Sequence, residues 1–211
     1  MSKAIHPVKR IESNHVYVAV SGGVDSMVAL HLMSRKHEVT ALHYVHAGCQ
    51  RADEELAFVV AYCRDNGIKL ITSHQVEPCP PKGSNEDHWR KGRYAFFNEF
   101  ADSPVVTGHT LDDAVEWYIF SACHGMGKYM EYANGHVIRP LLLTKKERII
   151  SYATRHNVPW VEDSTNADVD FAARNRIRHL IVPEVLKVNP GIHKVVAKRI
   201  RQKLEDFEKT C

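Results

Sequence analysis

The sequence has no pair of cysteines at the spacing of a metal or redox site. Its five cysteines are odd in number and scattered along the chain, at Cys49, Cys63, Cys79, Cys123 and Cys211. Zinc ribbons and iron–sulfur sites need closely spaced cysteines, so this distribution argues against both classes of protein. Unpaired thiols are typical of a reducing compartment. We therefore expect a cytoplasmic protein.

Long apolar runs are also missing. No stretch approaches the ~18–20 apolar residues of a membrane-spanning helix, and the N-terminus has no signal-peptide pattern. We expect no membrane partner. The length of 211 residues suits one α/β domain with a small appendage.

Apolar runs alternate with helix-like segments along most of the chain. Five of these runs predict strands, at Val16–Val20, Val39–Val45, Ile68–Thr72, Pro104–Gly108 and His136–Leu141. Repeated βα units predict an α/β, Rossmann-like fold with a parallel five-stranded sheet and helices on both faces. Thr144 and Glu147 match a capping box for one of these helices. We divide the chain into a domain over residues 1–182 and a basic helical extension over residues 183–211.

One glycine turn follows the first predicted strand and opens a helix. It has the sequence Ser21-Gly22-Gly23-Val24-Asp25-Ser26. Glycines allow close approach of an anion, and N–H groups at a helix N-terminus hold phosphate. Ser21 and Ser26 offer hydroxyl donors, and Asp25 offers a ligand for Mg²⁺. The turn lacks the Lys of the GxxxxGK[ST] loop and the three glycines of the dinucleotide motif. A plain turn is the alternative, since these residues favour turns.

Acidic residues follow the end of another predicted strand. The segment from Thr107 to Glu116 has the sequence TGHTLDDAVE. Because Glu116 lies four residues after Asp112 and three after Asp113, the three carboxylates are predicted to share one helical face. They suit Mg²⁺ or the ammonium group of a substrate; the alternative is favourable interaction with the helix dipole. Ligands bind beyond the carboxyl ends of such strands.

Basic residues gather in the last part of the chain. Between Arg174 and Lys203 there are nine Lys or Arg residues and one acid, Glu184. A polar loop, Glu162–Asn166, precedes this region, and Arg174 and Arg178 are one helical turn apart. Such a surface suits nucleic-acid phosphates, and a solvated helical face is the alternative.

These motifs resemble tRNA(Ile)-lysidine synthetase in its N-terminal catalytic domain. The Ser21–Ser26 turn alone resembles the PP-loop, the pyrophosphate-binding signature of ATP pyrophosphatases. The other matching segments are ALHYVHAG at Ala41, GRYAFF at Gly92, TGHTLDDAVE at Thr107, VIRPLL at Val137, VPWVEDSTN at Val158 and ARNRIRHLIVPEV at Ala173. Their order and spacing agree with this family over most of residues 15–190.

The resemblance implies a reaction and its participants. The family uses ATP to adenylate the C2 oxygen of the wobble cytidine in an isoleucine tRNA with a CAU anticodon, releasing pyrophosphate. The ε-amine of free L-lysine then attacks C2, and AMP leaves. ATP and Mg²⁺ are the implied cofactors, and tRNA and L-lysine are the implied partners.

The resemblance also assigns residues to roles. Catalysis is assigned to Asp25, Asp112, Asp113 and Arg174. ATP binding is assigned to Ser21, Gly22, Gly23, Val24, Asp25, Ser26, His43, His46, Thr107, Gly108 and His109. Binding of lysine or tRNA is assigned to Glu116, Arg93, Asp163, Asn166, Asn175 and Arg178. Mg²⁺ is assigned to Asp25 and Asp113.

The chain departs from the family at three places. The family's DDQAET segment is altered at Asp113–Trp117, a basic side chain is missing at Cys123 before a Gly-x-Gly turn, and the HGLR turn is only partly present at His46–Arg51. Longer members carry C-terminal domains that grip the tRNA. In this chain, the basic C-terminal segment of a homodimer is one possible replacement for those domains. The alternatives are a tRNA thiolase-like enzyme, whose cysteine chemistry needs paired cysteines, and a catalytically silent protein that binds tRNA or ATP.

Overall fold

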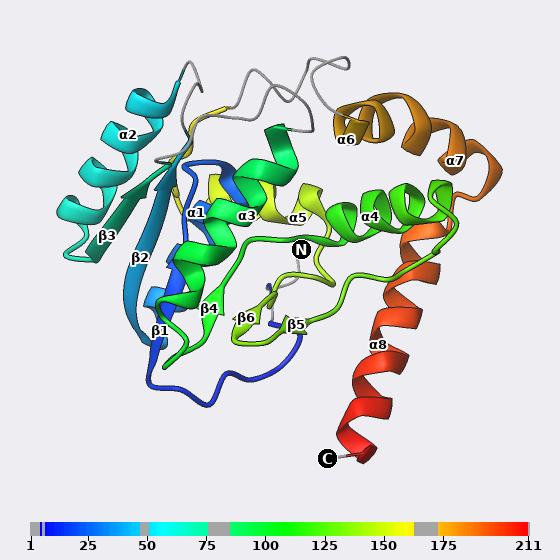
Figure 1. The fold of residues 1–211 in the computed structure, drawn as a ribbon, viewed down its shortest axis with the longest axis horizontal. Coiled ribbons are helices and arrows are strands. Elements are labelled where there is room, and N and C mark those ends of the chain that lie inside the picture. The colour runs from blue at the N-terminus through cyan, green and yellow to red at the C-terminus, as the bar shows by residue number, and fades with distance from the viewer. Residues whose placement is uncertain (1–4, 6, 47–50, 76–84, 163–172, 211) are drawn as a thin grey trace.

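A six-stranded sheet forms the centre of the molecule, in the order β3-β2-β1-β4-β6-β5 (Figure 1). The computed structural model describes residues 5, 7–46, 51–75, 85–162 and 173–210. The strands are β1 (His15–Ala19), β2 (Glu38–Val45), β3 (Lys69–His74), β4 (Val105–Val106), β5 (Ala133–Asn134) and β6 (Val137–Ile138). Five strands pair in parallel, which confirms the predicted sheet. The prediction missed β5, a short antiparallel strand that pairs with β6 at the edge.

Helices cover both faces of the sheet, as the sequence predicts. They are α1 (Val24–Ser34), α2 (Ala52–Asp65), α3 (Asn85–Asn98), α4 (Leu111–Cys123), α5 (Lys146–Arg155), α6 (Ala173–Arg176), the π-helix η2 (Ile177–Ile181), α7 (Val182–Val188) and α8 (Ile192–Thr210). Apolar residues of α1, α2 and α5 pack on one face, and those of α3 pack on the other. In the part of the chain that the structure describes, no helix is long and apolar enough to span a membrane.

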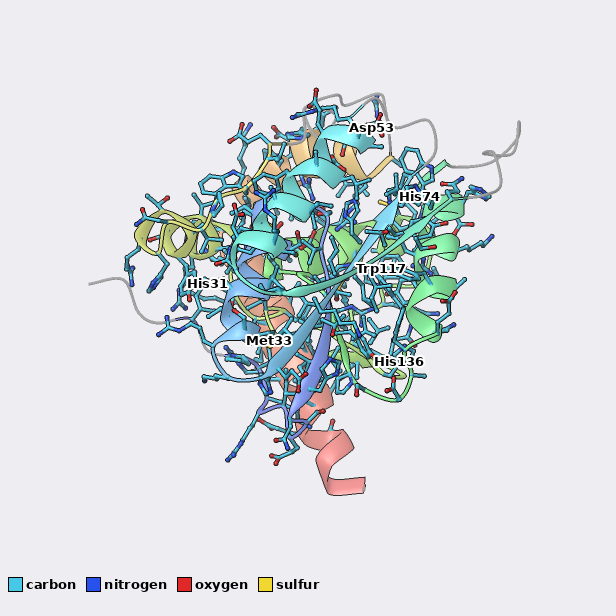
Figure 2. The ribbon with its side chains drawn as sticks, turned by 90° about the vertical axis from the view of Figure 1, so that its left-hand side faces the viewer. His31, Met33, Asp53, His74, Trp117 and His136 are labelled. Atoms are coloured by element: carbon cyan, nitrogen blue, oxygen red, sulfur yellow. The ribbon has the colours of Figure 1, made fainter. Side chains whose placement is uncertain are left out.

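The alternating side chains of β1 explain the two layers. Val16 and Val18 are buried with the residues of α1 and α5, whereas Tyr17 packs with the residues of α3, because successive side chains of a strand point to opposite faces. Figure 2 shows the two sides: His31 lies on the side of α5, and His136 lies on the side of α3. The Nδ1 atom of His31 is 3.0 Å from the hydroxyl of Tyr152 in α5, which fits this placement.

A separate apolar cluster joins α4 to the C-terminal helices. Ile192, Val196 and Ile200 recur along one side of α8 and pack with Val115 and Ile119 of α4, as expected for an amphipathic helix. Figure 1 shows α8 descending from the far end of α4, with α6 and α7 above it. The division of the chain at residue 182 stays a prediction, but residues on both sides of it contribute to this shared core.

A tight backbone contact joins the loop after β4 to the start of α1. A Cβ atom on Gly108 would lie 2.8 Å from the carbonyl carbon of Asp25 and 2.9 Å from the backbone nitrogen of Ser26. Glycine is therefore required at this position by close approach of two backbones. The contact brings the two predicted functional segments, Ser21–Ser26 and Thr107–Glu116, side by side.

We predict that Gly108→Ala lowers the free energy of unfolding by about 1–3 kcal/mol, because the added methyl group forces two backbones apart. Gly23→Ala is the matched control, since its Cβ would lie 3.6 Å from the nearest atom, Ser21 Oγ, an ordinary contact. Urea denaturation of both variants measures the difference. Equal stability of the two variants would contradict the tight contact.

Candidate active site

The loop between β1 and α1 is held in shape by its own hydroxyl groups. The Ser26 hydroxyl donates to the Gly23 carbonyl oxygen at 2.9 Å and accepts from the Ser21 backbone N–H at 3.1 Å. Gly22 has a φ of 89°, which L side chains rarely adopt. The Val161 N–H donates to the Gly22 carbonyl oxygen at 3.0 Å. The loop is therefore preformed, with the N-terminus of α1 behind it, as an anion-binding loop requires.

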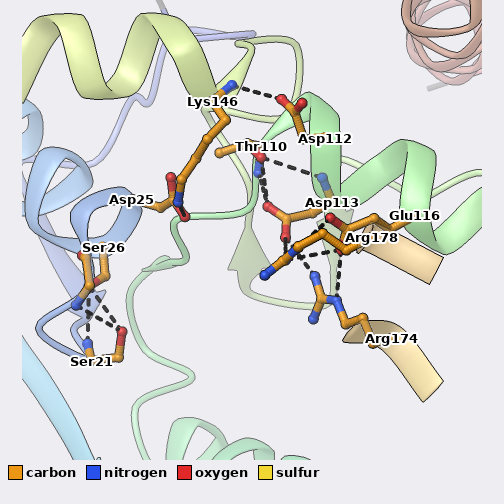
Figure 3. Close-up of polar contacts among 11 residues, drawn as sticks. Ser21, Asp25, Ser26, Thr110, Asp112, Asp113, Glu116, Lys146, Arg174 and Arg178 are labelled. Carbon is orange, nitrogen blue, oxygen red and sulfur yellow. Dashed lines mark hydrogen bonds and ion pairs between the residues drawn. The ribbon is translucent and has the colours of Figure 1, made fainter. Parts of the chain in front are cut away.

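Asp25 forms an ion pair with Lys146, a residue that the sequence analysis did not select. The Lys146 Nζ atom lies 2.5 Å from Asp25 Oδ2 (Figure 3). Asp25 Oδ1 is buried and has no hydrogen-bond partner among the described residues. Burial raises the pKa of Asp25, although Lys146 opposes the shift. Lys146 lies in the first turn of α5, where the helix dipole disfavours a positive charge. A lysine at this unfavourable position is the sequence signal that could have identified it.

Two carboxylates and two guanidinium groups form a compact cluster between α4, α6 and η2. Arg174 Nη2 lies 2.6 Å from Asp113 Oδ1, and Arg174 Nε lies 3.1 Å from Glu116 Oε2. Arg178 contacts both oxygens of Glu116, at 2.7 and 3.0 Å (Figure 3). Glu116 is only 5% exposed. We call Asp113, Glu116, Arg174 and Arg178 the ion cluster; it places charges of both signs beside the loop.

Asp113 is held in its ionised form. Thr110 caps α4, and Asp113 Oδ2 accepts from both the backbone N–H and the hydroxyl of Thr110, each at 2.7 Å. Burial by itself would raise the pKa of Asp113, but Arg174, His109 and the Thr110 bonds together lower it to about 2. Both oxygens of Asp113 are therefore engaged, whereas Asp25 keeps a buried oxygen without a partner among the described residues. Of the two predicted Mg²⁺ ligands, Asp25 fits the ion better.

Asp112 contacts different residues from the other two carboxylates of α4, although all three lie within about 100° around the helix. Its Oδ2 accepts from the backbone N–H of Lys146 at 2.7 Å, and its Oδ1 is 3.2 Å from Nε2 of His193 in α8. Consecutive helical residues are about 100° apart, so Asp112 and Asp113 meet different neighbours. The predicted capping box of α5 is wrong: its N-cap residue, Lys145, forms no side-chain cap, and Asp112 satisfies the first turn instead.

The predicted histidines have different surroundings. His43 Nδ1 is 2.8 Å from the Val20 carbonyl oxygen, and burial lowers its pKa. The His46 ring contacts the Trp89 ring at a tilt of 35°, and His46 Nε2 lies 3.1 Å from Arg93 Nη1. Burial, with a smaller effect of Arg93, lowers the pKa of His46 to about 3.

His109 lies between the strand end and the ion cluster. Its Nδ1 atom is 2.8 Å from the hydroxyl of Thr107. Burial lowers the pKa of His109 to about 4; Asp113 opposes this shift, and Arg139 adds to it. Asn175 is buried in α6, next to Arg174. Asp163 and Asn166 lie outside the described residues.

A model of the PP-loop domain family matches residues 1–185. The chain belongs to this family. The predicted resemblance to lysidine synthetases is confirmed by relatives of that name: the tRNA(Ile)-lysidine synthase of Lactiplantibacillus plantarum is 36% identical over 86% of this chain and 44% of its own length. The synthase of Thermosipho africanus is 32% identical over 94% of this chain and 50% of its own length. The chain thus spans about half the length of the curated relatives it matches.

Solved structures share the fold. The U34-tRNA thiolase NcsA of Methanococcus maripaludis superposes with a TM-score of 0.72 over 90% of this chain and 72% of its own, at 16% identity. The NH3-dependent NAD synthetase of Campylobacter jejuni gives a TM-score of 0.52 over 90% and 86%, also at 16% identity. At this identity the likeness concerns the fold alone. It agrees with the predicted α/β architecture.

We predict that the free energy of unfolding falls as the pH drops from about 6.5 towards 4, because unfolded histidines bind protons there and His109 and His46 do not. His109→Asn should reduce the dependence of the free energy of unfolding on pH by about 1.4 kcal/mol per pH unit, which is the contribution of one proton. His46→Asn should lower the slope in the same direction. Denaturation at several pH values measures it. A wild-type slope in both variants would contradict the burial of these rings in neutral form.

Proposed function

We propose that this chain carries out the ATP-dependent formation of lysidine on an isoleucine tRNA with a CAU anticodon. In this reaction ATP adenylates the C2 oxygen of the wobble cytidine with loss of pyrophosphate, and the ε-amine of L-lysine then displaces AMP from C2. The observation that carries the proposal is the position of the ion cluster beside the preformed loop. A loop suited to an anion and a cluster suited to a zwitterion thus lie close together, as the two substrates require.

The loop is proposed to hold the phosphates of ATP. Its N–H groups and serine hydroxyls bind the anion, and Lys146 adds positive charge close to Asp25. Mg²⁺ would be held by Asp25, whose buried Oδ1 is a suitable hard oxygen ligand. When bound, the ion neutralises charge on the leaving pyrophosphate. His43, His46, Thr107 and Gly108 would border the nucleotide at the ends of β2 and β4.

The ion cluster is proposed to bind free lysine. Asp113 and Glu116 suit an ammonium group, and Arg174 and Arg178 suit a carboxylate in forked geometry. The attacking ε-amine must lose a proton before it forms the bond to C2. Asp113, with a pKa of about 2, is better suited to holding the amine than to accepting this proton. Another carboxylate close to the bound amine is the candidate acceptor.

The remaining expectations belong to the same proposal. We place the reaction in the cytoplasm, where tRNA and free lysine meet, and keep a homodimer as one way to extend the basic surface.

No observation favours the thiolase-like alternative: of the described cysteines, Cys63 is free and buried with a pKa raised to about 11, and Cys123 is free and exposed. A silent binder would lack the turnover tested below.

We predict that incubation with ATP, labelled L-lysine and bulk tRNA yields a labelled cytidine adduct, detected by mass spectrometry of the nucleosides. Asp25→Ala should abolish adduct and pyrophosphate release without unfolding the protein, because the Asp25–Lys146 pair is partly exposed. Asp102→Ala is the matched control, since Asp102 is an exposed acid outside the candidate site. Adduct formation by Asp25→Ala would contradict its role; tRNA binding without any adduct in the wild type would indicate a silent binder.

We predict that Arg174→Ala impairs the reaction more than Lys203→Ala. Loss of a hydrogen-bonded charge pair is worth about 1.5–3 kcal/mol, so kcat/KM for lysine should fall roughly tenfold to a hundredfold. Lys203 is exposed and lies 3.8 Å from Glu131, so its loss should change little. Arg174→Lys retains the positive charge and is the control for loss of activity through misfolding. Equal effects of Arg174→Ala and Lys203→Ala would mean that both residues only attract phosphates.

A further inference from the structure

Three aromatic side chains contact one another in sequence along α4. The rings of Trp117 and Phe120 are stacked, with centroids 5.9 Å apart and planes at 24°. The rings of Phe120 and His124 follow at 4.3 Å and 35°. The spacing of three and then four residues places all three on one side of the helix. We call Trp117, Phe120 and His124 the aromatic stripe.

The aromatic stripe begins next to the ion cluster. Trp117 follows Asp113 by four residues, so the stripe continues the side of α4 that carries this carboxylate. Figure 2 places Trp117 on the side of the molecule that carries α3. At the other end of the stripe, Met126 is 50% exposed. The stripe therefore leads from the candidate site outward over the surface.

Core packing accounts for only part of the aromatic stripe. The buried residues of α4 that pack against α8 lie on the other side of the helix: Leu111, Ala114, Val115 and Ile119. Trp117 and Phe120 are only half-buried, and His124 is exposed. Phe120 packs partly against the apolar cluster, whereas Trp117 belongs to none of the buried clusters in the described part of the chain. Two large rings thus keep accessible area beside a charged site.

Aromatic rings beside the candidate site match the chemistry of an unpaired nucleobase. RNA loops present bases that are splayed out of the helix, and these stack on aromatic side chains. Such stacking tolerates any base, because every base has a π-face. The two carboxylates of the ion cluster are paired with two guanidinium groups, so the start of the stripe does not repel a polyanion.

We propose that Trp117, Phe120 and His124 stack against unpaired bases of the RNA loop that delivers the target base to the candidate site. This inference rests on the proposed function, because it assigns the aromatic stripe to the same RNA substrate. It also assigns a role to Trp117, one of the residues at which the chain departs from the DDQAET segment of the lysidine synthetase family. The base next to the target would meet Trp117, and the following bases would extend towards His124.

Binding of two RNAs to wild-type protein and Trp117 variants tests the proposal. One probe is a stem–loop with an unpaired anticodon loop, and the other is a fully paired RNA with the same number of phosphates. Trp117→Leu keeps an apolar side chain without a ring, and Trp117→Phe keeps a ring. We expect Trp117→Leu to weaken stem–loop binding about tenfold and leave duplex binding unchanged, because one base-stacking contact is lost. Trp117→Phe should restore most of the affinity, and His124→Ala should cause a smaller loss.

Other outcomes overturn the proposal. Unchanged stem–loop binding by Trp117→Leu would remove the stacking role, and equal loss of both RNAs would indicate a general structural effect. A change in oligomeric state without a change in RNA affinity would make the stripe a contact between proteins. Lysidine formation at saturating tRNA separates the two proposals: if Trp117→Leu forms lysidine and binds the loop as tightly as the wild type, only the stripe's role fails.

Discussion

The buried pairing of Glu116 with Arg174 and Arg178 is the interaction on which the candidate site depends. Glu116 is 5% exposed, and a charge in such a place is tolerated only when it is paired and hydrogen-bonded. Both arginines come from α6 and η2, far along the chain from α4. Because the buried carboxylate of Glu116 must be paired, its contacts with the two arginines hold α6 and η2 against α4. The pairing therefore joins two parts of the fold and sets the positions of the charges that we propose bind the zwitterionic substrate.

A second set of contacts connects this cluster to the Ser21–Ser26 loop. Gly108 allows the segment after β4 to lie against the backbone of Asp25, and Asp25 in turn contacts Lys146. Asp112 fixes the start of α5, which carries Lys146, and also contacts His193 of α8. Neighbouring acids on one helix thus serve different elements: Asp112 orders the helices around the loop, and Asp113 belongs to the ion cluster. The proposed reaction needs both arrangements, because its nucleotide and its amino acid must meet.

Much of this architecture follows from local sequence patterns. The alternation of β1, the turn at Ser21–Ser26 and the acids of α4 predicted the parallel sheet, the anion-binding loop and the residues gathered in the ion cluster. Contacts between distant segments were not predictable: Lys146 meets Asp25 only because α5 packs beside α1. The capping box from Thr144 to Glu147 failed for the same reason, since a distant carboxylate satisfies that helix end. The edge strand β5 has too few residues to show a period-two pattern.

A double-mutant cycle on the central pairing tests this account most directly. Glu116→Gln, Arg178→Gln and the double variant would each be unfolded in urea, and the coupling taken from the three changes in free energy of unfolding. If the pairing holds η2 against α4, each single variant removes the contacts of Arg178 with Glu116 and leaves the remaining charge with one partner fewer. The account then predicts a coupling energy of about 1–3 kcal/mol, with the double variant more stable than the sum of the single losses. Additivity within ~0.5 kcal/mol would contradict it.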